Sequence, residues 1–210
     1  MKEYQGCNWK TPEPANGESG KGLAEHIIAV IKRINHIRQV CDLGCGNGYL
    51  AGKLAELGYS VTGVDASASG VKIARENYPD VNFLCSQIGA HLPSLITQAQ
   101  FDLVISSDVI EHLYRPSDLL EAASALLVPG GHLLIGTPYN GYLKNIALSI
   151  TGHMDAHFTA LWDGGHIKFF SVKTLSELIV GHGFTDLRFF YYGRAPYLWK
   201  NMICYARKRR

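Results

Sequence analysis

The sequence lacks long apolar runs and an excess of charge of either sign, and each absence excludes a class of protein. No stretch approaches the roughly 18 consecutive apolar residues of a transmembrane helix. With 20 Lys and Arg against 18 Asp and Glu, the formal net charge of +2 does not by itself indicate nucleic-acid binding. Proline is scarce, and hydrophobic residues make up 47% of the chain, which excludes collagen and disordered proteins. The 210 residues are therefore expected to form a single globular domain.

Cysteine is also used sparingly, with five scattered residues. Cys41 and Cys45 lie four positions apart and form no C-x-x-C pair, so neither a disulfide framework nor a redox motif is expected. Cys41 and Cys85 stand in apolar runs and are expected to be small buried hydrophobic residues, which suits a reducing compartment. Since the first residues contain no apolar leader segment, we expect a cytoplasmic protein, either a monomer or a homodimer.

Short apolar runs rich in branched residues alternate with segments of helical spacing. The expected strands are 39–43, 60–64, 81–85, 101–106, 132–136, 184–192 and 197–206. The expected helices are a first one from residue 23 to about 35–38, then 49–57, 68–78, 117–128 and 172–182. Parallel strands need crossover connections, so the pattern predicts an α/β, doubly wound, mostly parallel seven-stranded sheet. The last two runs have no helix between them and are expected to be an antiparallel pair, while residues 1–22 form an N-terminal arm.

Three glycines at alternate positions follow the first expected strand, within the run VCDLGCGNGYL of residues 40–50. Gly44, Gly46 and Gly48 leave the backbone bare where the strand ends and a helix begins. In a doubly wound sheet, ligands bind outside the carboxyl ends of the strands, so this turn is placed for a nucleotide-like ligand. Asp65 ends the second expected strand, where a carboxylate can accept hydrogen bonds from both ribose hydroxyls.

Two cofactor classes use this arrangement. The spacing Gly46-x-Gly48-x-x-Ala51, with Asp65 about twenty residues further on, loosely matches a dinucleotide site, so an NAD-dependent oxidoreductase is one alternative. Asp42 favours the other class, because a carboxylate just before the first glycine suits a cation better than a pyrophosphate. An ammonium or sulfonium ligand is therefore favoured.

Residues 40–48 (VCDLGCGNG) resemble the first motif of the class I S-adenosylmethionine-dependent methyltransferases. Residues 101–104 (FDLV) and 127–131 (LVPGG) resemble the family's fourth strand and the turn before its fifth, and the resemblance covers residues 23–137. It implies S-adenosylmethionine as cofactor and S-adenosylhomocysteine as product. The implied cofactor residues are Asp42, Gly44, Cys45, Gly46, Gly48, Tyr49, Asp65, Ala66, Gln87, Ile88, Ser106 and Ser107. Gln87 stands where many members carry an acid near the adenine amino group, so an amide contact is expected there.

The segment from Asp108 to His112 follows the fourth expected strand, at the end of the sheet where the cofactor's methyl group would lie. Methyl transfer from a sulfonium needs an in-line nucleophile, which a base often deprotonates. His112 is the expected base, because histidine is the side chain that most readily exchanges a proton near neutral pH, and Glu111 is assigned with it as a catalytic residue.

The same segment resembles the E-x-x-E-H segment of the ubiquinone-biosynthesis O-methyltransferases and of the small-RNA 3′-terminal 2′-O-methyltransferases. In those groups the segment contributes to a divalent-metal site. The resemblance implies Asp108, Glu111 and His112 as ligands of Mg²⁺ or Zn²⁺, with His166 as a further ligand. Asp108 replaces the usual Glu and is one methylene shorter. The alternative is an acid/base and hydrogen-bonding role without a metal.

Residues 139–170 lie where the resembled family often places an acceptor-binding insertion or lid. Their aromatic side chains either line a water-poor pocket or form core under a long loop. Residues 142–150 are apolar at helical spacing, so they either dock on the domain or make peripheral contact with a membrane. The basic tail at 207–210 (RKRR) is interpreted as a solvated charge run, and nucleic acid is not favoured as a partner.

The function expected from the sequence is transfer of a methyl group from S-adenosylmethionine to a small hydroxylated acceptor, such as a phenol, a quinol or a natural product. N-methylation and RNA 2′-O-methylation by the same fold are alternatives. The other two are the NAD-dependent oxidoreductase and a protein that binds the cofactor without catalysis.

Overall fold

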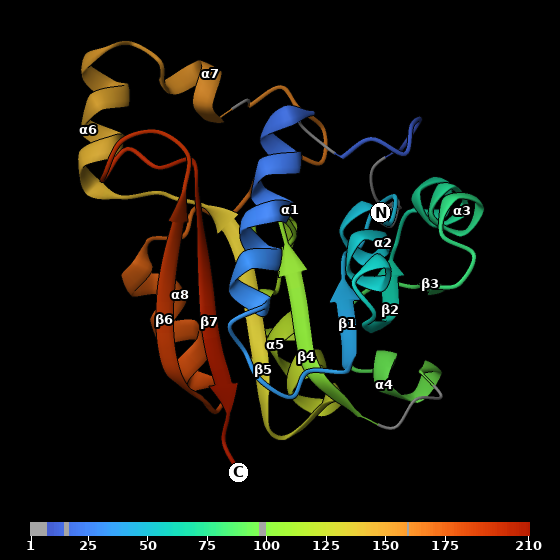
Figure 1. Ribbon diagram of the computed structural model, residues 1–210. Helices are drawn as coiled ribbons and strands as arrows, with labels where there is room; N and C mark the ends of the chain where they lie inside the picture. The colour runs from blue at the N-terminus through green and yellow to red at the C-terminus, as the bar shows by residue number, and fades with distance from the viewer. Residues whose placement is uncertain (1–7, 15–16, 97–99, 159) are drawn as a thin grey trace.

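A computed structural model describes residues 8–14, 17–96, 100–158 and 160–210, in which one seven-stranded sheet carries helices on both faces (Figure 1). The strands are β1 (Gln39–Leu43), β2 (Ser60–Asp65), β3 (Asn82–Cys85), β4 (Phe101–Ser107), β5 (Leu127–Pro138), β6 (Phe184–Tyr192) and β7 (Asn201–Lys208). Their order in the sheet is β3-β2-β1-β4-β5-β7-β6, and β7 alone runs antiparallel to its neighbours β5 and β6. The predicted α/β fold, with its antiparallel C-terminal pair, is confirmed.

The helices form two layers. They are α1 (Glu18–Ile31), α2 (Tyr49–Glu56), α3 (Ala68–Asn77), α4 (Leu92–Leu95), the 3₁₀ helix η1 (Ile110–His112), α5 (Pro116–Leu126), α6 (Tyr142–Ile150), α7 (Met154–Phe158) and α8 (Val172–Gly181). Apolar side chains of α1, α2 and α3 pack on one face of the sheet, and those of α4, α5 and α8 pack on the other. The parallel strands therefore carry apolar residues toward both faces, as a doubly covered sheet requires.

Two edges of the sheet result from this topology (Figure 1). The carboxyl edge, where β1, β2 and β4 end, carries the glycine turn, η1 and the loops that follow them. The amino edge, where those strands begin, lies beside the C-terminal end of α1 and the start of β5. In the orientation of Figure 1 the carboxyl edge is at the top. Every predicted cofactor residue from Asp42 to Ser107 lies near the carboxyl edge, as ligand binding in this fold requires.

Three local expectations need correction. The first helix begins at Glu18, within the predicted arm, where Glu18 pairs with Lys21 one turn later. The fifth strand begins at Leu127, within the predicted turn, and its pairing with β4 shifts register beyond Phe101. Cys85 is exposed at the end of edge strand β3, whereas Cys41 is buried as predicted. Alternate side chains of a strand face the same side, so Cys85 shares a face with buried Phe83. Its exposure therefore follows from its place at the end of β3.

The C-terminal strands depart from regular pairing at one place. The β6–β7 register shifts between Thr185 and Arg188, where Asp186 adopts a φ of 57°. This is a β-bulge in an edge strand. The start of the basic tail is correspondingly ordered: Lys208 Nζ donates to the carbonyl oxygens of Ser124 and Leu127. The tail is therefore not wholly a solvated charge run.

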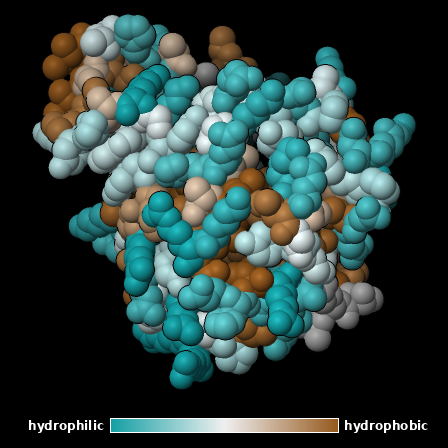
Figure 2. Space-filling model, viewed as in Figure 1, coloured by the Kyte–Doolittle hydropathy of each residue, from teal (hydrophilic) through white to brown (hydrophobic). Residues whose placement is uncertain are grey.

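Helix α6 stands away from the main body of the sheet (Figure 1). Its helical spacing was predicted correctly, but its apolar face is open. Tyr142 is 79% exposed and Ile150 is 80% exposed. Figure 2 shows hydrophobic side chains gathered at this end of the molecule, in the upper left of the view. Among the described residues, no helix is long and apolar enough to cross a bilayer.

Candidate active site

The glycine turn after β1 requires glycine at each alternate position. Gly44, Gly46 and Gly48 have φ angles of 85°, 55° and 80°, in the left-handed region that other residues avoid. A Cβ atom at Gly44 would lie 2.2 Å from Val109, and one at Gly46 would lie 2.5 Å from Trp9. The turn is thus packed closely by the protein's own side chains as well as being bare on its ligand side.

Two carboxylates flank this turn. Asp42 is 2% exposed, and burial together with the nearby Asp65 raises its pKa to about 7. Asp65 accepts hydrogen bonds from the amides of Gly46 at 2.8 Å and Ser67 at 2.7 Å, one on each oxygen. Burial raises the pKa of Asp65 as well. Each oxygen keeps a further lone pair, so the oriented carboxylate can still accept two hydroxyl donors. Among the described residues, neither Asp42 nor Asp65 forms an ion pair with a cationic side chain.

A segment of the N-terminal arm covers the turn from outside, through contacts of Trp9 and Asn47, neither of which was singled out in the sequence. The Trp9 amide donates to Ser69 Oγ at 3.0 Å, and its indole ring contacts the backbone of the turn at Gly46. Asn47 is buried, and its side-chain amide donates to the carbonyl oxygens of Thr11 and Glu13 at 3.0 and 2.6 Å. Asn47 lay within the glycine motif, but its partners are distant in the chain, so spacing could not reveal this role.

Glu111 lies in η1 and is 1% exposed. Its Oε2 accepts a hydrogen bond from Thr137 Oγ1 at 2.9 Å, while its buried Oε1 has no hydrogen-bond partner among the described residues. Burial, and to a smaller degree the charge of Asp108, raises the pKa of Glu111 well above its usual range. A buried carboxylate oxygen without a donor is costly unless a cation or a proton occupies it.

His112 is held by the loop that precedes α8. Its Nδ1 lies 2.8 Å from the carbonyl oxygen of Gly164 and 3.1 Å from that of Gly165. Since carbonyl oxygens only accept hydrogen bonds, Nδ1 carries the proton and Nε2 is left as the basic nitrogen. Two amides of the same loop, those of Ile167 and Lys168, donate to the backbone oxygen of Glu111. The loop therefore fixes both η1 and the imidazole.

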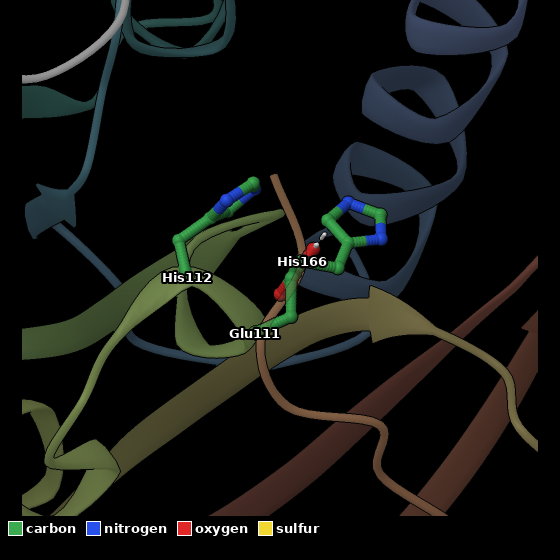
Figure 3. Close-up of side chains that lie close together, drawn as sticks. All are labelled: Glu111, His112 and His166. Carbon is green, nitrogen blue, oxygen red and sulfur yellow. Dashed lines mark ion pairs between the residues drawn. The ribbon is translucent and has the colours of Figure 1, made fainter. Parts of the chain in front are cut away.

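His166 completes a cluster with these two residues (Figure 3). Its Nε2 lies 3.9 Å from Glu111 Oε1, and one ligand atom from each of Glu111, His112 and His166 lies within 4.8 Å of the others. Burial, and then the neighbouring His112, lowers the pKa of His166 to about 4, so its imidazole is neutral. Two imidazoles and one carboxylate are a ligand set that divalent transition metals accept.

Asp108 is not part of this three-residue set, although it was predicted as a fourth ligand. It adopts a φ of 53°, and its Oδ1 accepts a hydrogen bond at 3.1 Å from Asn201 Nδ2 of β7. Burial raises the pKa of Asp108 to about 6. Its charge acts on Glu111, and of the four predicted ligands the structure brings together the other three, Glu111, His112 and His166.

The other predicted cofactor residues divide into two kinds. Ser106 and Cys45 are buried: Ser106 Oγ donates to the Leu43 carbonyl at 2.8 Å, and the Cys45 side chain packs in the core. Their side chains thus serve the fold, and only their backbone remains for a ligand. Half-buried or exposed side chains follow the strand ends at Tyr49, Ala66, Gln87, Ile88 and Ser107.

A hollow of about 400 Å³ lies between α6, α7 and the β6–β7 connection. Lys144, His157 and Arg194 line it together with small and apolar side chains. Lys144 and His157 lie close enough to His166 to lower its pKa further. The hollow is of a size that small-molecule sites have, and it is formed by the predicted insertion at 139–170.

The chain was compared with known protein families and proteins. A family described as "Methyltransferase domain" matches residues 17–188. The ubiquinone biosynthesis O-methyltransferase of Roseobacter denitrificans is 30% identical over 169 residues, which are 77% of this chain and 66% of that protein. The protein of the same name from Caulobacter sp. is 32% identical over 126 residues, 59% of this chain and 48% of the relative. The chain spans about half the length of the first curated relatives it matches.

Solved structures of low sequence identity share the fold. A SAM-dependent methyltransferase from Archaeoglobus fulgidus superposes with a TM-score of 0.71 at 19% identity, covering 91% of this chain and 95% of that one. Magnesium protoporphyrin IX methyltransferase from Synechocystis, with bound SAH, gives a TM-score of 0.64 at 19% identity, covering 89% and 81%. At such identities the likeness is one of architecture.

Proposed function

Because the chain belongs to the methyltransferase domain family, we propose that it transfers the methyl group of S-adenosylmethionine to a hydroxyl oxygen of a small phenol or quinol. The observation that carries this proposal is the close approach of Val109, three residues before His112, to Gly44 of the glycine turn. A base and a cofactor site thereby share one edge of the sheet. The names of the relatives, which are O-methyltransferases of ubiquinone biosynthesis, support a hydroxyl acceptor.

The residues at the turn fit a cationic adenosyl cofactor. Asp42 and Asp65 form a buried pair with raised pKa values, so a sulfonium or ammonium nearby would stabilise their ionised forms. Asp65 is held by two backbone amides with lone pairs left for ribose hydroxyls. When bound, S-adenosylmethionine supplies a methyl group on a positively charged sulfur, which leaves as a neutral thioether.

His112 Nε2 is the group that takes the proton from the acceptor hydroxyl. The carbonyl oxygens of Gly164 and Gly165 hold the proton on Nδ1 and stabilise the imidazolium that forms. The acceptor itself is proposed to enter from the hollow under α6 and α7, beside His166. General base catalysis of this kind contributes about 10²- to 10⁴-fold to a rate.

The direct test is a methyl-transfer assay in which S-adenosylhomocysteine is measured by mass spectrometry over a panel of phenols, catechols, quinols and amines. His112→Ala should lower the rate by about 10²-fold or more while S-adenosylhomocysteine binding persists. His182→Ala is the matched control, because His182 Nδ1 also lies within hydrogen-bond distance of a backbone carbonyl, that of Leu178 at 2.7 Å, but His182 lies at the C-terminal end of α8. Cofactor binding without turnover of any panel member would favour the non-catalytic alternative.

A metal-assisted form of this reaction is favoured by one specific observation, the partnerless Oε1 of buried Glu111 beside His166. Glu111, His112 and His166 would hold a divalent ion, with His112 bound through Nε2, so in this form the ion takes the place of His112 as the group that favours deprotonation. The hydrogen bonds from His112 Nδ1 would orient its ring as outer partners of metal-bound histidines do. Such an ion would supply positive charge that favours a deprotonated acceptor hydroxyl. The donor set suits Zn²⁺ better than Mg²⁺, which prefers oxygen ligands.

Calorimetric titration of chelator-treated protein with Zn²⁺ and with Mg²⁺ tests the metal directly. One equivalent of Zn²⁺ should bind, and Glu111→Gln should weaken it at least about tenfold. Asp108→Asn should change the affinity less, since Asp108 lies outside the ligand set. Failure of either ion to bind, together with an unchanged rate in EDTA, would leave the metal-free form.

The open apolar face of α6 is proposed to rest on a membrane surface, where a hydrophobic quinol would be found. This is supported by the exposed apolar side chains of Tyr142, Leu143, Ile146 and Ile150. A helix on a protein surface normally buries such an apolar stripe against another surface. Flotation with liposomes should recover the protein, and Leu143→Glu with Ile150→Glu should reduce recovery. Equal recovery of both proteins would exclude this role for α6.

A further inference from the structure

A second cavity lies at the amino edge of the sheet, remote from the glycine turn and η1. It has a volume of about 630 Å³ and lies between the C-terminal end of α1, the start of β5 and the antiparallel strands β6 and β7. Figure 2 shows a hydrophobic floor bordered by hydrophilic side chains in the lower centre of this face. The volume is within the range of sites for small molecules.

Three guanidinium groups surround this cavity without carboxylate partners. Arg33, Arg188 and Arg207 line it, and none of them forms an ion pair in the part of the chain that the structure describes. The carboxylate in the lining, that of Asp102, directs its Oδ2 to the amides of Arg38 and Gln39 at 2.9 Å each. The lining therefore keeps an excess of positive charge.

Two of the guanidinium groups, those of Arg188 and Arg207, lie near a polar pair of side chains in the cavity wall. His132 Nδ1 and Tyr205 Oη are 2.9 Å apart, with their rings tilted against each other. The charges of Arg207 and Arg188 both act on the Tyr205 phenol, while Arg207 Nε donates to the carbonyl of Gly130 at 2.9 Å. That hydrogen bond fixes the guanidinium plane and leaves further N–H donors for a ligand.

The cavity also has an apolar part. Its lining includes the apolar side chains of Val30, Ile34, Ile37, Val128 and Phe190, beside the polar side chains of Asn35 and His36. An inorganic anion would contact only the guanidinium groups, whereas a ring bearing an anionic group would use both parts of the cavity. Arginine is suited to phosphate and carboxylate because its planar fork matches their paired oxygens.

We propose that this cavity is a binding site for a small aromatic anion, one with a phosphate or carboxylate group on an apolar ring. The anionic group contacts Arg188 and Arg207, and the ring lies against Phe190 and Ile34. The site is separate from the cofactor edge, so its occupation does not require a methyl donor.

Isothermal titration of the full chain with phenyl phosphate and with benzoate tests the site and distinguishes the two anionic groups. We expect saturable one-to-one binding of at least one of them, and weaker binding of inorganic phosphate and of uncharged benzyl alcohol. Arg188→Gln should weaken the binding at least about tenfold, because it removes a charged hydrogen-bond donor. Arg188 is exposed, so this change should leave the melting temperature and S-adenosylhomocysteine binding unaltered.

Arg115→Gln is the matched control, because it removes the same charge from an exposed side chain outside the cavity. It should leave phenyl phosphate binding unchanged. Phe190→Ser should weaken phenyl phosphate binding more than that of inorganic phosphate, which reports on the apolar wall independently. The proposal is overturned if neither aromatic anion saturates, if Arg188→Gln binds as the wild type does, or if inorganic phosphate binds equally well.

Discussion

The carboxyl edge and the amino edge of the sheet carry charged side chains of opposite sign, and these side chains also differ in burial. The carboxyl edge gathers carboxylates, and Asp42 and Glu111 are almost fully buried there. The amino edge gathers guanidinium groups, of which Arg33 and Arg188 are exposed. Among the described residues, the buried carboxylates of the carboxyl edge have raised pKa values and no paired cation at hydrogen-bonding distance, whereas the arginines around the amino-edge cavity have no paired anion.

The helices account for part of this difference. Helices α2 and α3 begin at the carboxyl edge, so their positive dipole ends face its carboxylates. Helices α1 and α5 end at the amino edge, so their negative ends face the arginines. The helix dipoles thus favour side chains of opposite charge at the two edges, and the carboxyl edge differs further because Asp42 and Glu111 are buried there.

The largest expected effect tests the depth of the carboxylates, through Asp42. Its pKa rises from 3.8 to about 7 in the folded protein, so ionisation destabilises the fold increasingly as the pH rises through that window. Asp42→Asn removes this penalty. The variant should therefore gain up to about 4 kcal/mol over the wild type at pH 8 and nothing at pH 3.

Urea unfolding at several pH values measures this difference. Asp80→Asn, at an exposed carboxylate, is the control and should show no such trend. A gain for Asp42→Asn that is the same at pH 5 and pH 8 would contradict buried ionisation.

A smaller effect separates the edges by ligand. Asp65→Ala removes two acceptor oxygens for ribose hydroxyls and should weaken S-adenosylhomocysteine binding about 100-fold. The same variant should bind phenyl phosphate as the wild type does, because Asp65 is at the other edge. Titration calorimetry with both ligands measures this, and parallel loss of both would mean that the variant is misfolded or that the edges are coupled.

The cover over the glycine turn provides the next test. Trp9→Ala should weaken S-adenosylhomocysteine binding about tenfold, because the indole packs against the turn at Gly46 and restricts its conformation. Asn47→Ala should act in the same way, since its amide anchors the covering segment. If both act through one segment, the double variant should lose little more than either alone. Additive losses would show that the two residues act separately.

The smallest effect concerns salt. Raising NaCl from 50 to 500 mM should weaken phenyl phosphate binding several-fold, because exposed guanidinium groups are screened. S-adenosylhomocysteine binding should change less, since the protein's carboxylates at the carboxyl edge are largely buried and Trp9 covers the glycine turn. Calorimetry at the two salt concentrations decides this, and an equal salt dependence at both edges would remove the distinction between them.

The fold could be predicted from the sequence because its periodicities are local. Runs of branched apolar residues indicated the strands, and helical spacing indicated the longer helices. The resemblance pointed to Glu111, His112 and His166, which the structure brings together. The start of β5 was missed because Pro129, Gly130 and Gly131 are typical of a turn, yet a register shift accommodates them in a strand.

What could not be predicted depends on partners distant in the chain. Asp108 accepts a hydrogen bond from Asn201 of β7, which is brought there by the pairing of β7 with β5, and no local pattern specifies that pairing. Trp9 meets Gly46 through an arm of irregular sequence, and the cationic cavity takes its lining from several separate segments. The positions of such residues follow from tertiary packing, which spacing along one chain does not encode.

The bulge in β6 has a consequence for association. As an edge strand, β6 presents backbone groups that another chain could extend into a continuous sheet. The left-handed residue Asp186 breaks the straight register of that edge and places a charge on it. A bulge and a charge at this position disfavour the addition of a further strand along β6.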